Sequence, residues 1–212
     1  MSSTILDVSI PQGYMQMPLT DIGARFATVA QLTEELAPPD MKRLAHEVLP
    51  AYALMLEALA EMDARYCGIG RHTSSTGELV ISCLTVCVVD SDEKRNPRLV
   101  LKELVTSRVE AGDAFGATEV LEVDGRPMLF AERVVGLPAP EIPGRAQLAD
   151  TTPTYQLEAV VPAGDGSTLA AIEMSTASVE RGPEFRKMIV DIARSVAFTA
   201  AVDLDQPSSL NL

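Results

Sequence analysis

Residues 65–90, RYCGIGRHTSSTGELVISCLTVCVVD, are the stretch that decides how this chain folds. Two runs rich in apolar and β-branched residues flank TSSTG, a polar link that contains a glycine, and this pattern is typical of a β-hairpin. We expect the turn to be centred near Ser75. The cross-strand pairs that follow from this centre are His72 with Glu78, Cys67 with Cys83, and Ile69 with Ile81.

The predicted hairpin has one apolar face, because side chains two residues apart in a strand point the same way. We expect this face, which carries the cysteines, to lie in the core. It contains Cys67, Ile69, Leu79, Ile81, Cys83, Cys87 and Val89. His72 then points the other way, beside Tyr66, Gly68 and Gly70. A zinc site needs about four convergent ligands, so we interpret the cysteines as buried apolar residues and predict no metal site.

The G-x-G formed by Gly68 and Gly70 is not interpreted as a phosphate-binding loop. A dinucleotide-binding fingerprint has a third glycine at a fixed spacing and opens a helix. Here that glycine is missing and a second strand follows. Small residues in a strand more often mark a bulge or a close approach of another element, so the sequence favours a structural role for both glycines.

The other elements follow from periodicity and from turn and capping residues. Asp-Gly between β-rich runs is a strong hairpin signal, and Pro50 interrupts a helical pattern, where we expect a kink or a restart. The expected elements are a helix over 20–36, a helical stretch over 40–64, a helix after Asn96 that ends near Gly112, hairpins at Asp124-Gly125 and Asp165-Gly166, a long surface loop over 136–153, and a helix that begins at Pro183. Three hairpins interleaved with helices predict the α+β class, with a sheet covered by helices.

Composition and charge exclude several classes of function. The chain has 212 residues and a formal net charge of −13, which repels phosphate backbones. We therefore expect no nucleic-acid partner. No apolar run reaches the roughly 20 residues that span a bilayer, and the start of the chain lacks the pattern of a signal peptide. Three cysteines form no disulfide framework. The sequence thus predicts a cytoplasmic protein without a membrane span.

Residues that could carry chemistry are few. The sequence lacks the common nucleophile, phosphate-loop and zinc motifs, and its only histidines are His46 and His72. The pairs Glu34/Glu35, Glu61/Asp63 and Asp90/Asp92 are more typical of solvated helix ends and turns than of acid–base sites. We therefore assign no catalytic, cofactor-binding or metal-binding residue.

Segments of apolar pattern across about half of the chain resemble the Mog1/PsbP-like fold, in particular its actinobacterial LpqN-type branch. They are IPQGYMQMPL (10–19), NPRLVLKELV (96–105), GRPMLFAERVV (125–135), TYQLEAVVP (154–162) and the stretch from Leu169 to Phe198. The resemblance implies an α/β/α sandwich around a mainly antiparallel sheet, here of about six strands. It also implies a non-catalytic role in binding proteins or assisting assemblies. We expect residues 1–200 to form one such domain, followed by a flexible tail over 201–212.

Two hypotheses for the function remain open. The first is a non-catalytic module that binds another protein, with a contact that involves the loop 136–153, stiffened by Pro138, Pro140, Pro143 and Pro153. The second is an enzyme or small-ligand carrier with a site between the sheet and the helical stretch 40–64. Its expected residues are Tyr52, Tyr66 and His72. A deep pocket with convergent polar groups favours the second hypothesis, and an exposed apolar patch favours the first.

Overall fold

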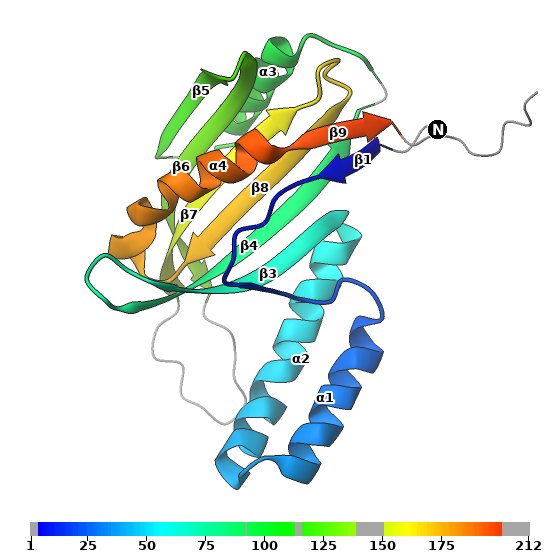
Figure 1. The fold of residues 1–212 in the computed structure, drawn as a ribbon, viewed down its shortest axis with the longest axis vertical. Helices are drawn as coiled ribbons and strands as arrows, with labels where there is room; N and C mark the ends of the chain where they lie inside the picture. The colour runs from blue at the N-terminus through cyan, green and yellow to red at the C-terminus, as the bar shows by residue number, and fades with distance from the viewer. Residues whose placement is uncertain (1–3, 92, 113–115, 139–150, 201–212) are drawn as a thin grey trace, which may run out of the picture.

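The computed structural model describes residues 4–91, 93–112, 116–138 and 151–200. Within them, a seven-stranded antiparallel sheet and a separate two-stranded ribbon are combined with four α-helices and one 3₁₀ segment (Figure 1). This confirms the predicted α+β sandwich, with seven strands in the main sheet instead of about six.

The elements of the main sheet lie in the order β2-β3-β4-β8-β7-β6-β5. Their bounds are β2 Tyr14–Gln16, β3 Ala64–Thr73, β4 Leu79–Asp90, β8 Thr168–Thr176, β7 Thr151–Pro162, β6 Arg126–Pro138 and β5 Ala117–Val123. The ribbon pairs β1 (Thr4–Asp7) with β9 (Ala197–Ala200). The helices are α1 Ile22–Leu36, α2 Pro39–Glu61, α3 Pro97–Glu110 and α4 Arg186–Ser195, and the 3₁₀ segment η1 spans Val179–Phe185.

The β3–β4 hairpin exists as predicted, but its register differs by two residues. The observed pairs are His72 with Val80, Ile69 with Cys83, and Cys67 with Thr85. The turn explains the shift: Ser74 N–H donates to Glu78 O at 2.8 Å, and Gly77 has a φ of 85°. A three-residue loop that ends on a left-handed glycine places the centre of the hairpin at Thr76 instead of Ser75.

The burial of β4 is the reverse of the prediction. Its core face is formed by Val80, Ser82, Leu84, Val86 and Val88. On the cysteine face, Leu79, Ile81 and Val89 are about half exposed, and only Cys67 of β3 is fully buried. The predicted set of residues does share a face, because a shift of two residues preserves the alternation. That face is not the main core. The alternation of side chains shows which residues share a face, but it does not show which of the two faces is packed under more of the structure.

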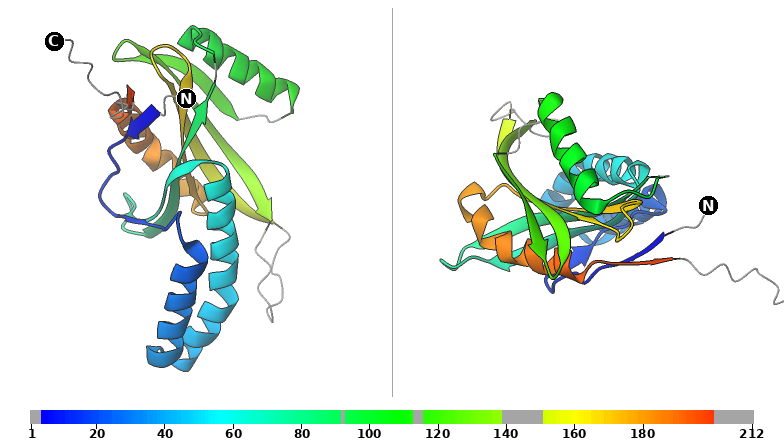
Figure 2. Two further views of the ribbon diagram at one scale, coloured as in Figure 1. Left: turned by 90° about the vertical axis from the view of Figure 1, so that its right-hand side faces the viewer. Right: turned by 90° about the horizontal axis from the view of Figure 1, so that it is seen from above.

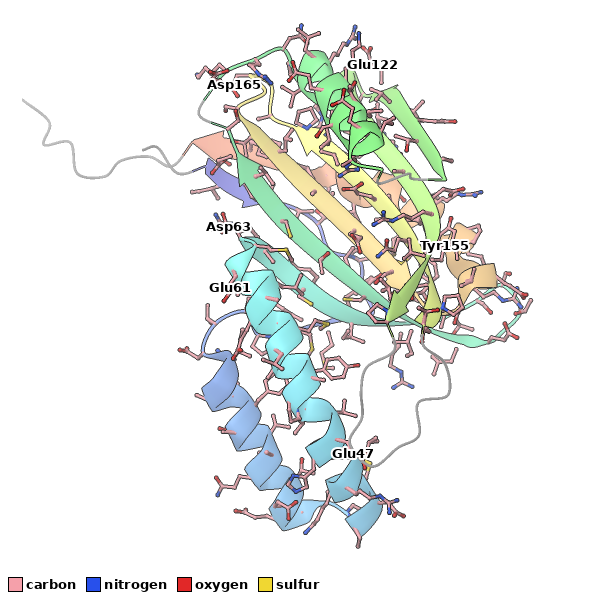
Figure 3. All side chains as sticks on the ribbon, turned by 180° about the vertical axis from the view of Figure 1, so that it is seen from behind. Glu47, Glu61, Asp63, Glu122, Tyr155 and Asp165 are labelled. Atoms are coloured by element: carbon pink, nitrogen blue, oxygen red, sulfur yellow. The ribbon has the colours of Figure 1, made fainter. Side chains whose placement is uncertain are left out.

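Two layers cover the sheet. On the front, α4 and the β1–β9 ribbon pack on the largest apolar cluster, which includes Ile189 and Ile192 of α4 (Figure 1). On the back, α3 covers β6 and β7 through Leu101, which contacts Leu129 and Val160. The α1–α2 pair packs against β3 on the same side (Figure 3). The described part of the chain is therefore layered helix, sheet, helix.

The helix pair α1–α2 extends beyond the edge of the sheet (Figure 2). Only its inner end is anchored to the sheet, through a small cluster of Ile22 and Leu56 with Cys67. Of the kink or restart predicted at Pro50, the restart does not occur, because α2 runs as a single helix from Pro39 to Glu61. An exposed face at Pro50 tolerates the lost backbone hydrogen bond.

The remaining local predictions are largely confirmed. Asn96 caps α3 by accepting from Arg98 N at 3.0 Å. The turn between β5 and β6 has positive φ at Asp124 and Gly125. The final helix begins later than expected, because Pro183 lies inside the 3₁₀ segment and α4 starts at Arg186. Among the described residues, no helix is both long and apolar enough to cross a membrane.

The loop predicted over 136–153 begins later and ends earlier than expected. Gly136 pairs with Pro153 and Pro138 pairs with Thr151, so both ends belong to the β6–β7 ladder. Pro153 is tolerated because β8 pairs with β7 only from Tyr155 onward, so no strand requires its missing N–H on that side. Residues 139–150, including Pro140 and Pro143, lie outside the described residues, as does the predicted tail 201–212.

Candidate functional site

His72 lies at the centre of a polar cluster on the front face of the sheet. Its Nε2 is 3.0 Å from Ser82 Oγ, which is also 2.9 Å from the hydroxyl of Tyr14. Burial lowers the pKa of His72 and raises that of Tyr14 to about 12. The rings of Tyr14 and Phe185 contact the imidazole edge-on. His72, although it lies next to the hairpin turn, is therefore partly buried.

The Ser82–His72 pair has the geometry of a nucleophile beside a general base, but it lacks two features that such a catalytic pair needs. Ser82 is only 2% exposed, and within the described chain no carboxylate hydrogen-bonds to the His72 ring to orient it. The packing around the cluster requires glycine at position 70, because a Cβ on Gly70 would lie 2.4 Å from His72 Nε2 and 2.9 Å from Ser82 Oγ. We therefore interpret the cluster as packed core structure, which agrees with the structural role expected for the G-x-G.

The three residues expected to form a ligand site are not brought together. Tyr66 and His72 belong to the front face, where Tyr66 packs on the main apolar cluster. Tyr52 lies on α2 and is 40% exposed, and α2 packs on the back face of β3. The predicted site between the sheet and residues 40–64 is thus not formed by these residues, because the pleat of β3 turns Tyr66 and His72 away from α2.

The cysteines lie on the back face, away from His72, as predicted. The neighbouring Cys67 thiol, and secondly burial, raises the pKa of the Cys83 thiol. Burial also raises the pKa of Cys87. Among the described residues, no group of three or more histidine, cysteine or acidic side chains is arranged to hold a metal ion.

Three of the acidic residues singled out from the sequence bond to three different partners. Glu34 bonds to His46, Asp63 bonds to Arg65, and Asp90 accepts from Thr168. Figure 3 places Glu61 and Asp63 at the end of α2 beside the sheet. Asp92 lies outside the described residues. Neither of the two pairs that lie wholly within the described residues forms a convergent acid–base site.

Two carboxylates that the sequence analysis did not single out lie side by side on the back of the sheet. Glu158 of β7 is directly opposite Glu173 of β8. Arg108 of α3 donates to Glu158 at 2.7 Å, and Gln156 donates to Glu173 at 3.2 Å. Burial, and secondly the charge of Glu158, raises the pKa of Glu173. A cross-strand pair of this kind has no local sequence signal, because its members are 15 residues apart and a helix supplies the cation.

A groove of about 280 Å³ lies between α4 and the β5–β6 hairpin. Its apolar lining comes mainly from Leu121, Phe130, Leu157, Ile189 and Val190. At one wall Glu132 accepts from Arg186 and from the hydroxyl of Tyr155, each at 2.7 Å. Arg186 lowers the pKa of Glu132, and burial followed by the Glu132 contact raises that of Tyr155 to about 12. These polar groups bond mainly to one another instead of converging on the groove.

The α1–α2 hairpin carries nine of the twenty large apolar side chains that are exposed in the described part of the chain. In both helices, partly buried positions such as Phe26, Ala30 and Ala53 face the partner helix. Beside this contact line lies a row of large apolar side chains that are 38–79% exposed. We call this row the apolar face; it comprises Val29, Leu32 and Leu36 of α1 and Met41, Leu44, Tyr52, Met55 and Met62 at α2.

Both rows lie on the same side of the hairpin. Glu34 Oε1 and His46 Nε2 are 2.7 Å apart, so the sides of α1 and α2 that carry them meet on one face. Each residue turns a helix by about 100°, which places Leu32 and Leu36 on the other side of the contact line in α1. The same rotation places Leu44 on the other side in α2. The hairpin is thus amphipathic, with Glu34 and His46 on one face and the apolar face opposite. Arg25, four residues before Val29 and seven before Leu32, is a charged residue that the same rotation places in line with the α1 row.

Comparison with known proteins does not supply a function. No protein-family model matches the sequence, and a search of curated proteins finds no match either. The function of this chain therefore has to be inferred from its surfaces, among them the apolar face of the α1–α2 hairpin.

Proposed function

We propose that this protein is a non-catalytic protein-binding or accessory module, and that the apolar face of the α1–α2 hairpin is its contact surface. The observation that carries the proposal is the exposure of this face. Monomeric soluble proteins rarely expose contiguous apolar patches of more than a few hundred Å² unless the patch is functional. The eight side chains of the apolar face are large and uncharged, and Leu36 at the tip is 79% exposed.

The polar clusters support a binding role over catalysis. Ser82 is closed off from solvent beside His72, and Glu158 is neutralised by Arg108. Each cluster therefore satisfies its own hydrogen bonds and charges instead of presenting an unsatisfied group to a substrate. We also propose that the module works in the cytoplasm, since free Cys67, Cys83 and Cys87 are typical of a reducing compartment.

The resemblance to the Mog1/PsbP-like fold stays part of this proposal. That resemblance implies an antiparallel sheet with helices on both faces, and the chain has this arrangement. The arrangement supports the proposed fold family, but it does not distinguish the LpqN-type branch from other branches. The contact expected at the loop 136–153 concerns mainly residues outside the described ones. The hairpin replaces it as the proposed contact surface.

Photo-cross-linking in the native cell tests the proposal. A photoreactive phenylalanine analogue placed at Met41, on the apolar face, should give covalent adducts with protein. The matched control is the same analogue at Arg43, which is on the same turn, 71% exposed and directed to the charged side. Equal adducts from both positions, or none from Met41, would show that the apolar face is not a contact surface.

A second candidate is favoured by the groove between α4 and β5–β6, which has an apolar floor and an Arg186–Glu132 pair at its wall. Such a groove suits a small, mostly apolar ligand, in keeping with the carrier hypothesis. Its volume of about 280 Å³ is slightly below the roughly 300–1,000 Å³ that is usual for ligand sites. A ligand of this kind should shift the amide signals of Leu121 and Val190 in NMR spectra and leave those of the hairpin unchanged.

A further inference from the structure

We propose that the partner of the apolar face is a second copy of this chain, and that two α1–α2 hairpins pack face to face around a two-fold axis. The inference rests on the proposed function, because it names the occupant of the same surface. Four helices would then form one antiparallel bundle, in which each hairpin covers the apolar face of the other.

The first support is the symmetry of the apolar residues along α2. A two-fold axis perpendicular to an antiparallel helix pair brings together residues that lie at equal distances from its midpoint. About a midpoint between Ala51 and Tyr52, the pairs that meet are Met41 with Met62, Leu44 with Leu59, and Val48 with Met55. Every pair is apolar on both sides, so α2 matches an antiparallel copy of itself along its whole length.

Two of the six residues that would meet across the axis are already partly buried within one chain. Val48 and Leu59 are intermediate in exposure, while the residues they would meet, Met55 and Leu44, are 38% and 42% exposed. In each predicted pair, both side chains therefore still have exposed surface that the second copy would bury. None of the six residues carries a charge, so no desolvated ion would be left where the two copies of α2 meet.

The second support is the size of the surface. The 23 residues of α2 and the 15 of α1 give helices of about 35 Å and about 22 Å at 1.5 Å per residue. With helices packed about 10 Å apart, one face of the hairpin covers on the order of 600 Å². Stable interfaces bury about 800 Å² of accessible surface on each partner. Side chains make the accessible area of a helix face larger than its flat outline. The apolar face therefore has the size that a stable dimer needs.

The third support is charge. The formal net charge is −13, so two copies repel each other over most of their surfaces. A contact between copies is favoured only through a surface without acidic groups, and the apolar face is such a surface. The projection of the hairpin beyond the sheet leaves this face accessible to the hairpin of another copy (Figure 2).

The oligomeric state tests the proposal. The full chain should sediment as a dimer, at twice the mass of the 22.7 kDa chain, and dissociate on dilution. Leu44→Glu combined with Met55→Glu should give a monomer with unchanged circular dichroism, because two like charges per copy would face an apolar partner. Leu54→Glu is the control: it adds one glutamate to the same helix, at a side chain that is 68% exposed and outside the apolar face, and it should leave the dimer intact.

Disulfide trapping tests the antiparallel register. Ala51→Cys lies next to the two-fold axis and should form a covalent dimer upon mild oxidation. Ala58→Cys is one heptad away on the same side of the helix, so its two copies would be about 20 Å apart at 1.5 Å per residue, and it should stay monomeric on a non-reducing gel. Equal trapping at both positions would overturn the antiparallel register, since a parallel pair brings both into contact.

The outcomes separate this inference from the proposed function. A chain that stays monomeric at about 100 µM, or a dimer that survives Leu44→Glu with Met55→Glu, overturns the second copy as the occupant. If Met41 then still cross-links to a protein of another mass in the cell, the binding role stands with a different partner. If Met41 gives no adduct at all, both proposals fail.

Discussion

At the scale of single residues, His72 shows how the fold turns a potential chemical group into core structure. The imidazole lies between the rings of Tyr14 and Phe185 and bonds to Ser82. Burial lowers its pKa below the usual value. The neutral form is therefore favoured in the folded protein, and protonation favours unfolding.

A pH titration of stability tests this environment. Because the folded pKa is depressed, the contribution of His72 is complete above the unfolded pKa of about 6.5 and is lost as the pH falls through the folded pKa. We expect the free energy of unfolding, from urea denaturation, to fall between about pH 7 and pH 5 less steeply in His72→Gln than in the parent. His46→Gln, at a histidine 68% exposed, is the control. An unchanged slope in His72→Gln would contradict the assignment.

At the scale of elements, α4 is the helix that closes the main core. Phe185, Ile189, Ile192 and Val196 recur at helical spacing and are at most 7% exposed. Lys187, between two of them, is 87% exposed and pairs with Asp191. The strong contrast between the two sides explains why the sequence pattern was sufficient to identify this face.

Substitutions in α4 should follow this contrast. Ile189→Asp would place an unpaired carboxylate at a position that is 2% exposed, and we expect a loss of at least about 3 kcal/mol in the free energy of unfolding. Lys187→Ala removes only a surface ion pair and should cost less than about 1 kcal/mol. Thermal or urea denaturation measures both. A melting temperature of Ile189→Asp within a few degrees of the parent would show that α4 is not a core element.

At the scale of the whole molecule, the hairpin and the sheet differ in how they are held. The strands β7 and β8 are paired on both edges, and β7 is buried on both faces over most of its length. Among the described residues, the outer half of the hairpin contacts mainly itself, because its anchor at Ile22 and Leu56 lies at the inner end. Local stability follows buried contacts.

Hydrogen exchange should report this difference. In dilute protein, where a dimer dissociates, the amides of residues 28–48 should exchange faster than those of Leu157–Val161 in β7. Protection of the hairpin should rise with protein concentration while that of β7 stays constant. Equal protection of both regions in dilute protein would show that the hairpin is held to the sheet by more than its anchor.

The sequence by itself determined the local structure. Asp124-Gly125 specified a turn because its positive φ angles suit few other residues, and Asn96 with Pro97 specified the start of α3. These signals depend only on neighbours in the chain. The same holds for the separation of His72 from the cysteines, which the alternation of β3 fixes in either register.

Only the tertiary structure decided which apolar faces are covered. The faces of β4 were both apolar in the sequence, and the main core formed on the side of Leu84 because α4, about 100 residues later, packs there. The row from Met41 to Met62 had the spacing of a core helix, yet α2 extends past the sheet and leaves it exposed. A periodic pattern shows that a face prefers burial, but what covers it depends on contacts distant in sequence, whether within one chain or between two.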